Sequence, residues 1–189
     1  PVLNQIFAIV ITPTKALTSD QLGQIKRYAE PCGINVGMLT GDVGENGKIE
    51  LLNNPPQILL TNFDMIYTHL LRDARFAPWF TDFKMLVIDE VHYYEGIHGS
   101  NIHHLLAALK RYSPKLQMVA ASATIDNLDE FSKKLFNTEK VKVIQSNQKN
   151  GVTQLAVISP SGISFSALLL DLCRFLVSKK KQFLIFLPI

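Results

Sequence analysis

The chain has 189 residues, of which 47% are hydrophobic and 19% are charged. This composition is typical of a folded globular protein and excludes a disordered chain. The formal net charge of +3 is compatible with a phosphate-backbone partner, but an ordinary, slightly basic surface explains it equally well. The two cysteines, Cys32 and Cys173, form no C-x-x-C pair, so the sequence suggests two buried free thiols and neither a zinc ribbon nor a disulfide framework.

The longest apolar runs, such as Phe7 to Ile11 and Phe183 to Leu187, are too short to cross a bilayer. No signal-peptide pattern opens the chain, and we therefore expect a cytoplasmic protein. A strand-like run follows Pro1 almost at once and another ends the chain, which suggests part of a longer protein.

Strand-like runs alternate with helical patterns along the chain. The predicted strands are Phe7–Thr12, Asn35–Leu39, Gln57–Thr61, Met85–Asp89, Gln117–Ala121, Val141–Ile144, Gln154–Ile158 and Gln182–Leu187. Helical spacing of apolar residues occurs around 102–109, 129–136 and 168–176. Continuous apolar strands separated by helices predict an α/β fold, with a parallel sheet covered by helices on both faces. The polar stretch Ser146–Gly151 predicts a domain boundary.

In a parallel sheet, ligands bind beyond the carboxyl ends of the strands, so the residues that follow each strand are the candidates for function. Here each of these segments is polar or turn-forming: Pro13-Thr14-Lys15, Thr40-Gly41-Asp42, Thr61-Asn62, Asp89-Glu90-Val91-His92 and Ser122-Ala123-Thr124. A purely structural domain does not need every strand to end in this way.

The pair Asp89-Glu90 follows a hydrophobic strand, where an unpaired charge is costly. One carboxylate can hold Mg²⁺ directly or through water, and the next can deprotonate an attacking water. A solvated strand end is the alternative. Ser122 and Thr124 can relay hydrogen bonds, although they are also suited to cap a helix.

The remaining segments are compatible with phosphate binding. Thr14 and Lys15 begin a predicted helix, whose free N–H groups attract phosphate, but they could equally be a cap and a surface lysine. Gly41 would allow the close approach of a sugar-phosphate chain, or could belong to a plain turn. Thr61 precedes Asn62 at another strand-to-helix turn, where Asn62 could be only a helix cap.

In this order and spacing, the five segments resemble the motifs of superfamily 2 helicases of the DExH type. Asp89-Glu90-Val91-His92 resembles the nucleotide-hydrolysis motif, and Ser122-Ala123-Thr124 resembles the motif that couples hydrolysis to nucleic acid. The stretch Tyr94-Glu-Gly96-Ile-His-Gly99-Ser100 resembles the Tyr-x-Gly-x-x-Gly-Ser pattern of a DNA helicase branch that includes YprA-like and fungal Hrq-like enzymes.

The resemblance implies a RecA-like first motor domain over residues 1–146, followed by a linker and the beginning of a second RecA-like domain over 147–189. It implies ATP and Mg²⁺ as cofactors, with Asp89 contacting Mg²⁺ through water, Glu90 activating the attacking water and His92 linking the ATP site to Ser122 and Thr124. The residues that would contact the nucleic-acid backbone are Thr14, Lys15, Gly41, Thr61 and Asn62. The implied function is an ATP-dependent helicase or translocase that moves along a single strand, with DNA favoured over RNA.

The sequence departs from the family pattern because it contains no P-loop. The only Gly-Lys pair, Gly47-Lys48, lacks both the earlier glycine and the following Ser or Thr, and we interpret it as a surface turn. The P-loop is expected upstream of Pro1, so the bare chain should not hydrolyse ATP. A degenerate, inactive helicase-like binding or scaffolding module remains the alternative. The other histidines, including His69, are expected to be solvated or unrelated to a zinc site.

Overall fold

The computed structural model describes residues 5–122, 127–144, 162 and 164–181. The chain divides into two compact units, Pro1–Ile144 and Gln145–Ile189. In the second unit the described residues form one helix, α6, over Phe165–Ser178, which begins where the Ser164 hydroxyl accepts a hydrogen bond from the Ala167 N–H. None of the described helices is both long and apolar enough to cross a membrane.

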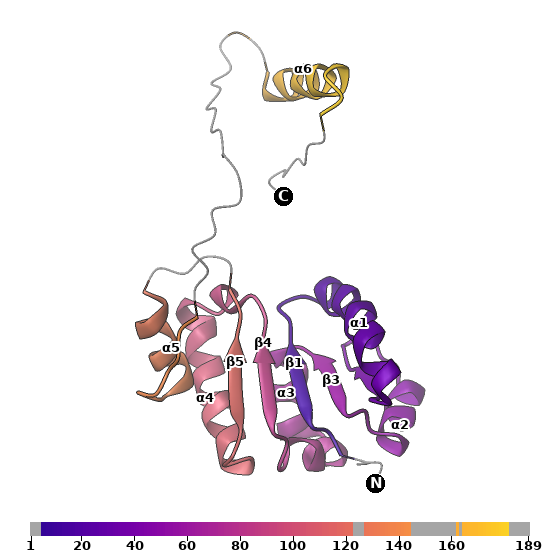
Figure 1. Ribbon diagram of the computed structural model, residues 1–189, viewed down its shortest axis with the longest axis vertical. Helices are drawn as coiled ribbons and strands as arrows, with labels where there is room; N and C mark the ends of the chain where they lie inside the picture. Colours follow the sequence, from indigo (N-terminus) through magenta and orange to yellow (C-terminus); the bar gives the residue numbers. More distant parts are fainter. Residues whose placement is uncertain (1–4, 123–126, 145–161, 163, 182–189) are drawn as a thin grey trace. The chain divides into compact units, whose positions relative to one another are not determined.

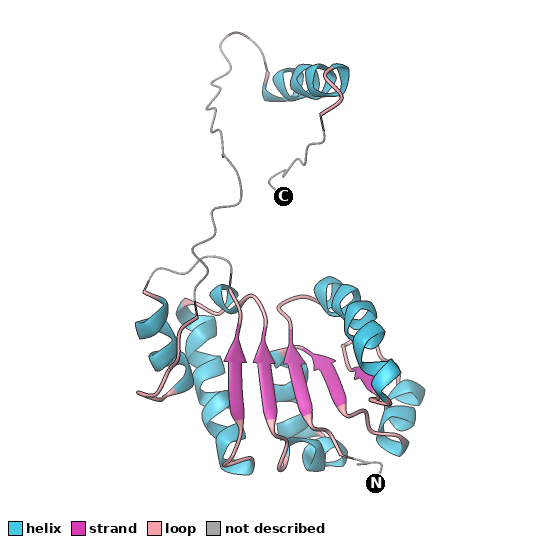
Figure 2. Ribbon diagram, in the orientation of Figure 1, coloured by secondary structure: helices cyan, strands magenta, loops and turns pink. Residues whose placement is uncertain are grey.

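The first unit is built on a parallel sheet with the strand order β2-β3-β1-β4-β5 (Figures 1 and 2). The strands are β1 (Ala8–Ile11), β2 (Val36–Met38), β3 (Ile58–Thr61), β4 (Met85–Ile88) and β5 (Gln117–Ala120). Ile11, the last residue of β1, pairs with Thr61 on one side and with Ile88 on the other. Three neighbouring strands therefore end at the same level, which brings the segments that follow them to one edge. The predicted parallel sheet is confirmed.

A helix follows each strand along the chain, although the sequence predicts none over Glu45–Asn53. The helices are α1 (Lys15–Ala29), α2 (Glu45–Asn53), α3 (Phe63–Arg72), α4 (Gly96–Tyr112) and α5 (Leu128–Phe136), with 3₁₀ turns η1 (Glu30–Cys32), η2 (Ala74–Phe80) and η3 (Val91–Tyr93). Alternation along β1 sends Ile9 and Ile11 into the large core under α3, α4 and η2, and Val10 into a smaller core under α1. The hydrophobic core on the α3 and α4 face of the sheet is thus much larger than the core on the α1 face.

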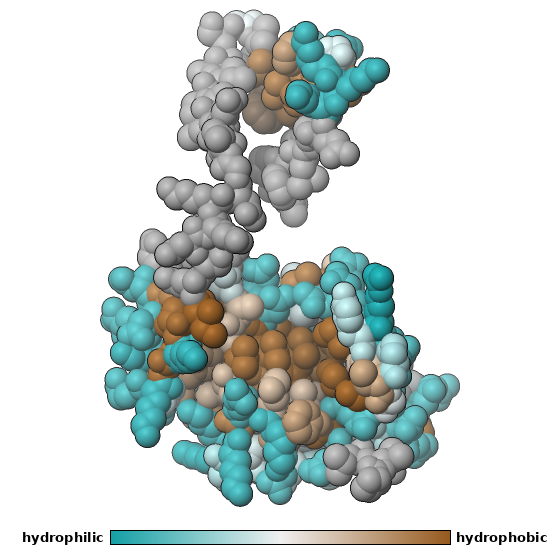
Figure 3. Space-filling view, viewed as in Figure 1, coloured by the Kyte–Doolittle hydropathy of each residue, from teal (hydrophilic) through white to brown (hydrophobic). Residues whose placement is uncertain are grey.

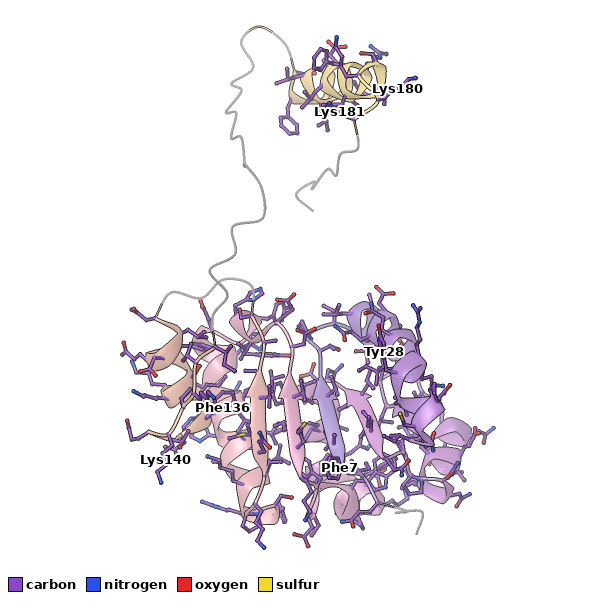
Figure 4. The ribbon with its side chains drawn as sticks, in the orientation of Figure 1. Phe7, Tyr28, Phe136, Lys140, Lys180 and Lys181 are labelled. Carbon is purple, nitrogen blue, oxygen red and sulfur yellow. The ribbon has the colours of Figure 1, made fainter. Side chains whose placement is uncertain are left out.

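The α1 side of the sheet is partly open over β4 and β5. Val119 is 41% exposed and Phe7, just before β1, is 48% exposed, while Val87 is only partly buried. Figure 3 shows hydrophobic side chains gathered across the middle of this face, and Figure 4 shows Phe7 at its lower end. Parallel sheets are normally covered on both faces, so this surface is suited to packing against a further element.

Several sequence-based expectations are wrong in the described residues. The segment Val141–Ile144 is not a strand, since it pairs with no other strand and Ile144 is 83% exposed. Gly47 and Lys48 lie inside α2 and not in a turn; a β-carbon on Gly47 would come within 2.9 Å of Val43, so this glycine allows close packing. The predicted strands Gln154–Ile158 and Gln182–Leu187 lie outside the described residues.

The expected burial is also reversed for three side chains. Cys32 is exposed and Cys173 is partly exposed, so neither is the buried thiol that was predicted. His69, expected in solvent, is only 2% exposed and packs against Phe76, with ring centroids 4.4 Å apart and the rings tilted by 48°. It lies three residues after the buried Ile66 on α3, and this helical spacing places it on the core face.

Candidate active site

The Asp89 carboxylate is held in place at the end of β4. The Asp89 N–H donates to the Ile11 carbonyl at 2.8 Å, which fixes the backbone against β1. Its Oδ1 accepts from the Glu90 N–H at 3.0 Å, and its Oδ2 accepts from the Gln21 side-chain amide at 2.9 Å. Gln21 comes from α1, and sequence reasoning did not assign it a role.

The Asp89 group fits a hydrated magnesium ion. Each of its oxygens receives one hydrogen bond from the described residues and keeps a further lone pair, and the residue is only partly buried. Mg²⁺ usually retains several waters and binds one or two carboxylates together with substrate phosphates. No group of three or more His, Cys, Asp or Glu that could hold a metal occurs in the described part of the chain. Beyond the described residues, waters and nucleotide phosphates would complete the coordination.

Glu90 adopts a left-handed backbone conformation, with φ 50° and ψ 48°. For a residue with a side chain this conformation costs on the order of 1–3 kcal/mol and is retained where the surroundings enforce it. Here the Asp89 N–H is bonded to β1 and the Val91 N–H donates to the Ala121 carbonyl at 2.9 Å. The resulting sharp turn leads into η3 and returns His92 to the side of Glu90.

His92 connects Glu90 to the segment after β5. Its Nδ1 lies 3.2 Å from Glu90 Oε2 and 3.0 Å from Ser122 Oγ, and both the Glu90 and His92 side chains are partly exposed. The structure therefore brings together three of the side chains that the sequence singled out. Thr124 lies outside the described residues, and its predicted role remains a prediction.

Lys15 and Gly41 meet at the end of the sheet beside β1 and β2. Thr14 caps α1, because its hydroxyl accepts from the Leu17 N–H at 3.3 Å. The Lys15 ammonium lies 2.6 Å from Asp42, and both side chains are more than half exposed. A β-carbon on Gly41 would lie 3.5 Å from the Lys15 ammonium nitrogen, so the lysine extends across this glycine.

Thr61 and Asn62 both make local hydrogen bonds. Thr61 is 1% exposed, and its hydroxyl donates to the Leu39 carbonyl at 2.7 Å. Asn62 caps α3, its side-chain oxygen accepting from the Met65 N–H at 2.9 Å. The capping alternative considered from the sequence is thus present at Asn62, whose amide N–H donors make no hydrogen bond among the described residues.

The glycines after the Asp-Glu pair have separate structural reasons. Gly96, the first residue of α4, has a φ of +61°, which side chains rarely adopt. A β-carbon on Gly99 would come within 2.4 Å of the Tyr94 carbonyl oxygen. The two glycines in Tyr94-x-Gly96-x-x-Gly99 therefore allow a tight turn, in which the first turn of α4 packs directly against the Tyr94 backbone.

Comparison with known proteins identifies relatives over most of the chain. The family model described as DEAD/DEAH box helicase matches residues 2–131. An ATP-dependent helicase of Methanocaldococcus jannaschii, described as uncharacterized, is 32% identical over 94% of this chain and 28% of its own length. The helicase YprA of Bacillus subtilis is 31% identical over 68% of this chain and 18% of its own length. The ATP-dependent helicase hrq1 of Schizosaccharomyces pombe is 30% identical over 75% of this chain and 14% of its own length.

Solved structures give the same picture of the fold. The DUF1998 helicase MrfA superposes with a TM-score of 0.71 and 25% identity over 97% of this chain and 29% of its own. MrfA bound to DNA and AMPPNP superposes with a TM-score of 0.61 and 26% identity over 71% of this chain and 20% of its own. These neighbours confirm the predicted RecA-like fold of superfamily 2 helicases. The chain spans less than a third of the length of these relatives and structures.

Proposed function

The chain belongs to the DEAD/DEAH box helicase family, and from that premise we propose that the full-length protein is an ATP-dependent helicase or translocase acting on DNA. In this proposal, ATP hydrolysis is coupled to movement along a single strand. The observation that carries it is the connected series Asp89, Glu90, His92 and Ser122, which spans the ends of two adjacent strands. In this series, two carboxylates are available for ATP hydrolysis, and a histidine and a serine connect them to the segment after β5, through which strand binding could be coupled to hydrolysis.

In the proposed hydrolysis step, Glu90 accepts a proton from the attacking water. Asp89, oriented by Gln21 and by the Glu90 N–H, would hold Mg²⁺ through water, and the ion would neutralise charge on the nucleotide phosphates. The left-handed turn at Glu90 lets the two adjacent carboxylates have different partners, Gln21 for Asp89 and His92 for Glu90, which suits these two roles. Asp89 is hydrogen-bonded to β1 and to Gln21, whereas the polar partner of the Glu90 carboxylate among the described residues is the His92 ring.

His92 provides the proposed link between hydrolysis and strand binding. One ring nitrogen faces both Glu90 and Ser122, and it cannot serve both fully at once. In the tautomer with hydrogen on Nδ1, this nitrogen donates to the Glu90 carboxylate; in the other tautomer it accepts from the Ser122 hydroxyl. A shift of Ser122 on strand binding would therefore alter the hydrogen bonding of Glu90.

The proposed nucleic-acid contacts lie along the same edge of the sheet. Lys15 and the N-terminus of α1 offer positive charge, and Gly41 leaves room for a phosphate chain. Asn62 offers its amide N–H donors, whereas Thr61 can contribute only through its backbone, because its hydroxyl is buried. Such contacts position a strand without reading its sequence. DNA is favoured because MrfA is seen with DNA.

Nucleotide binding requires parts that these residues do not supply. The sequence has no Gly-x-x-x-x-Gly-Lys motif. The open sheet face beside Val87 and Val119 fits an additional helix of the full-length protein. We therefore assign the P-loop to another segment of that protein. A cytoplasmic location remains a prediction from the sequence.

The proposal is tested by ATP hydrolysis of the full-length protein with single-stranded DNA, with matched RNA and without nucleic acid. Stimulation by DNA supports a DNA-dependent motor. Stimulation by RNA alone would retain the motor and reverse the choice of substrate. No hydrolysis with either polymer, together with tight strand binding, would favour an inactive helicase-like binding module.

A further inference from the structure

A groove of about 730 Å³ opens between the start of α3 and residues 98–108 of α4, beside the candidate strand-binding edge. It shares Pro13 and Asn62 with the segments proposed to contact the nucleic-acid backbone. Its other principal walls are Tyr67 of α3, Tyr93 of η3, and His98 and Asn101 of α4. This volume lies within the range of small-molecule binding sites.

Aromatic rings form much of the groove. Tyr94 packs edge-on against Phe63 with centroids 5.0 Å apart, and Tyr93 packs edge-on against Tyr94 at 5.8 Å. Phe63 and Tyr94 are buried, and they anchor this series in the core. Tyr93 of η3 and Tyr67 of α3 are instead 56% and 51% exposed, so two aromatic side chains of the lining remain accessible.

The polar lining favours an uncharged ligand group. Among the side chains that the structure describes, no lysine or arginine lines the groove, and Asp64 is the one carboxylate. Phosphate is therefore disfavoured inside it, in contrast to the nearby edge that carries Lys15. The Asn62 amide and the side chains of His98 and Asn101 offer hydrogen-bonding groups suited to the edge of a heterocycle.

One buried hydroxyl in the groove wall has no hydrogen-bond partner in the described part of the chain. Tyr94 is 5% exposed, and its hydroxyl oxygen is fully buried without a partner among the residues that the structure describes. Burial, followed by the nearby Asp64 charge, raises the pKa of Tyr94, which keeps the hydroxyl protonated as a donor. Unsatisfied buried groups are rare in folded proteins and call for an explanation such as an absent ligand or water.

We propose that this groove binds a nucleobase of the bound strand, stacked against Tyr93 and Tyr67, while the neighbouring edge of the sheet holds the sugar-phosphate backbone. The assignment rests on the proposed nucleic-acid-binding function and adds a base-dependent contribution to it. Aromatic stacking tolerates every base, because each has a flat π-face. The groove thus increases affinity for single strands, whose bases can turn outward, without imposing a sequence.

The test measures binding of the full-length protein to two fluorescein-labelled strands of equal length by fluorescence anisotropy. One strand is oligothymidylate, and the other carries an abasic tetrahydrofuran unit at every position. Tyr93→Ala and Tyr67→Ala are each expected to weaken oligothymidylate binding about ten-fold and to leave abasic-strand binding unchanged. Tyr93→Phe should retain the wild-type preference, because the stacking ring remains.

Tyr28→Ala is the matched control, since Tyr28 is a more exposed tyrosine on α1, away from the groove (Figure 4). It should change neither affinity. If Tyr93→Ala weakened binding to both strands equally, or to neither, the groove assignment would be overturned and the proposed function would stand. If the wild-type protein bound neither strand, the nucleic-acid proposal would fail, and the groove assignment with it.

Discussion

Replacing Gly99 by alanine tests whether the turn after the Asp-Glu pair is as tight as the structure shows. The added β-carbon would lie 2.4 Å from the Tyr94 carbonyl oxygen, a backbone atom that cannot rotate away. Overpacking of this kind costs about 1–3 kcal/mol. Alanine also gains up to about 1 kcal/mol over glycine within a helix, which partly offsets the clash.

Gly23→Ala removes this ambiguity, because Gly23 also lies within a helix and a β-carbon there meets nothing within 4 Å. The gain in helix propensity is common to both variants, so their difference isolates the clash at Gly99. We expect Gly99→Ala to be less stable than Gly23→Ala by roughly 1–3 kcal/mol. In the full-length protein, the β1 and β4 amides should exchange hydrogen about 5- to 150-fold faster in Gly99→Ala than in Gly23→Ala. Equal exchange in the two variants would refute the close approach.

Three further predictions concern coupling, pH and the missing P-loop. Ser122→Ala should reduce the DNA-stimulated rate of ATP hydrolysis more than the unstimulated rate. Ser100→Ala, which removes only a hydroxyl bonded within α4, should leave the ratio of these two rates unchanged. An unchanged ratio in Ser122→Ala would contradict the His92 link. Burial lowers the pKa of His69, so the folded state binds a proton less readily than the unfolded state, and stability should fall as pH drops below about 6.5. In His69→Leu, hydrogen exchange should show a weaker loss of stability between pH 7.5 and 5.5; an unchanged loss would assign the pH dependence to other groups. The bare chain should hydrolyse no ATP in a phosphate-release assay, and Glu90-dependent turnover would overturn the assignment of the P-loop to another segment.

The strands were predictable because each is a continuous apolar run followed by polar residues, as in β4 and its Asp89-Glu90 end. The same reasoning failed at Val141–Ile144, because a short apolar run becomes a strand only if it finds a hydrogen-bonding partner. The glycine at position 47 is typical of a turn, but it lies in α2, where its small size allows close packing against Val43. Local patterns therefore located the sheet better than its connections.

The site was predictable in its residue types but not in its contacts. The motif order singled out His92 and Ser122, and the fold brings them together. Nothing local marks Gln21 as the partner of Asp89, since the two are 68 residues apart and Gln21 is an ordinary helix residue. The Tyr94 hydroxyl was also missed, because only three-dimensional packing shows that a buried polar group lacks a partner.

The most direct test of the proposed motor is Glu90→Gln in the full-length protein, beside Glu50→Gln on the exposed face of α2. Nucleotide binding, followed with a fluorescent ATP analogue, and DNA-stimulated hydrolysis should be measured on the same preparations. If Glu90 activates the attacking water, Glu90→Gln should bind the nucleotide normally and lose about 10²- to 10⁴-fold in kcat, while Glu50→Gln keeps wild-type turnover. Wild-type turnover in Glu90→Gln would contradict the proposed mechanism.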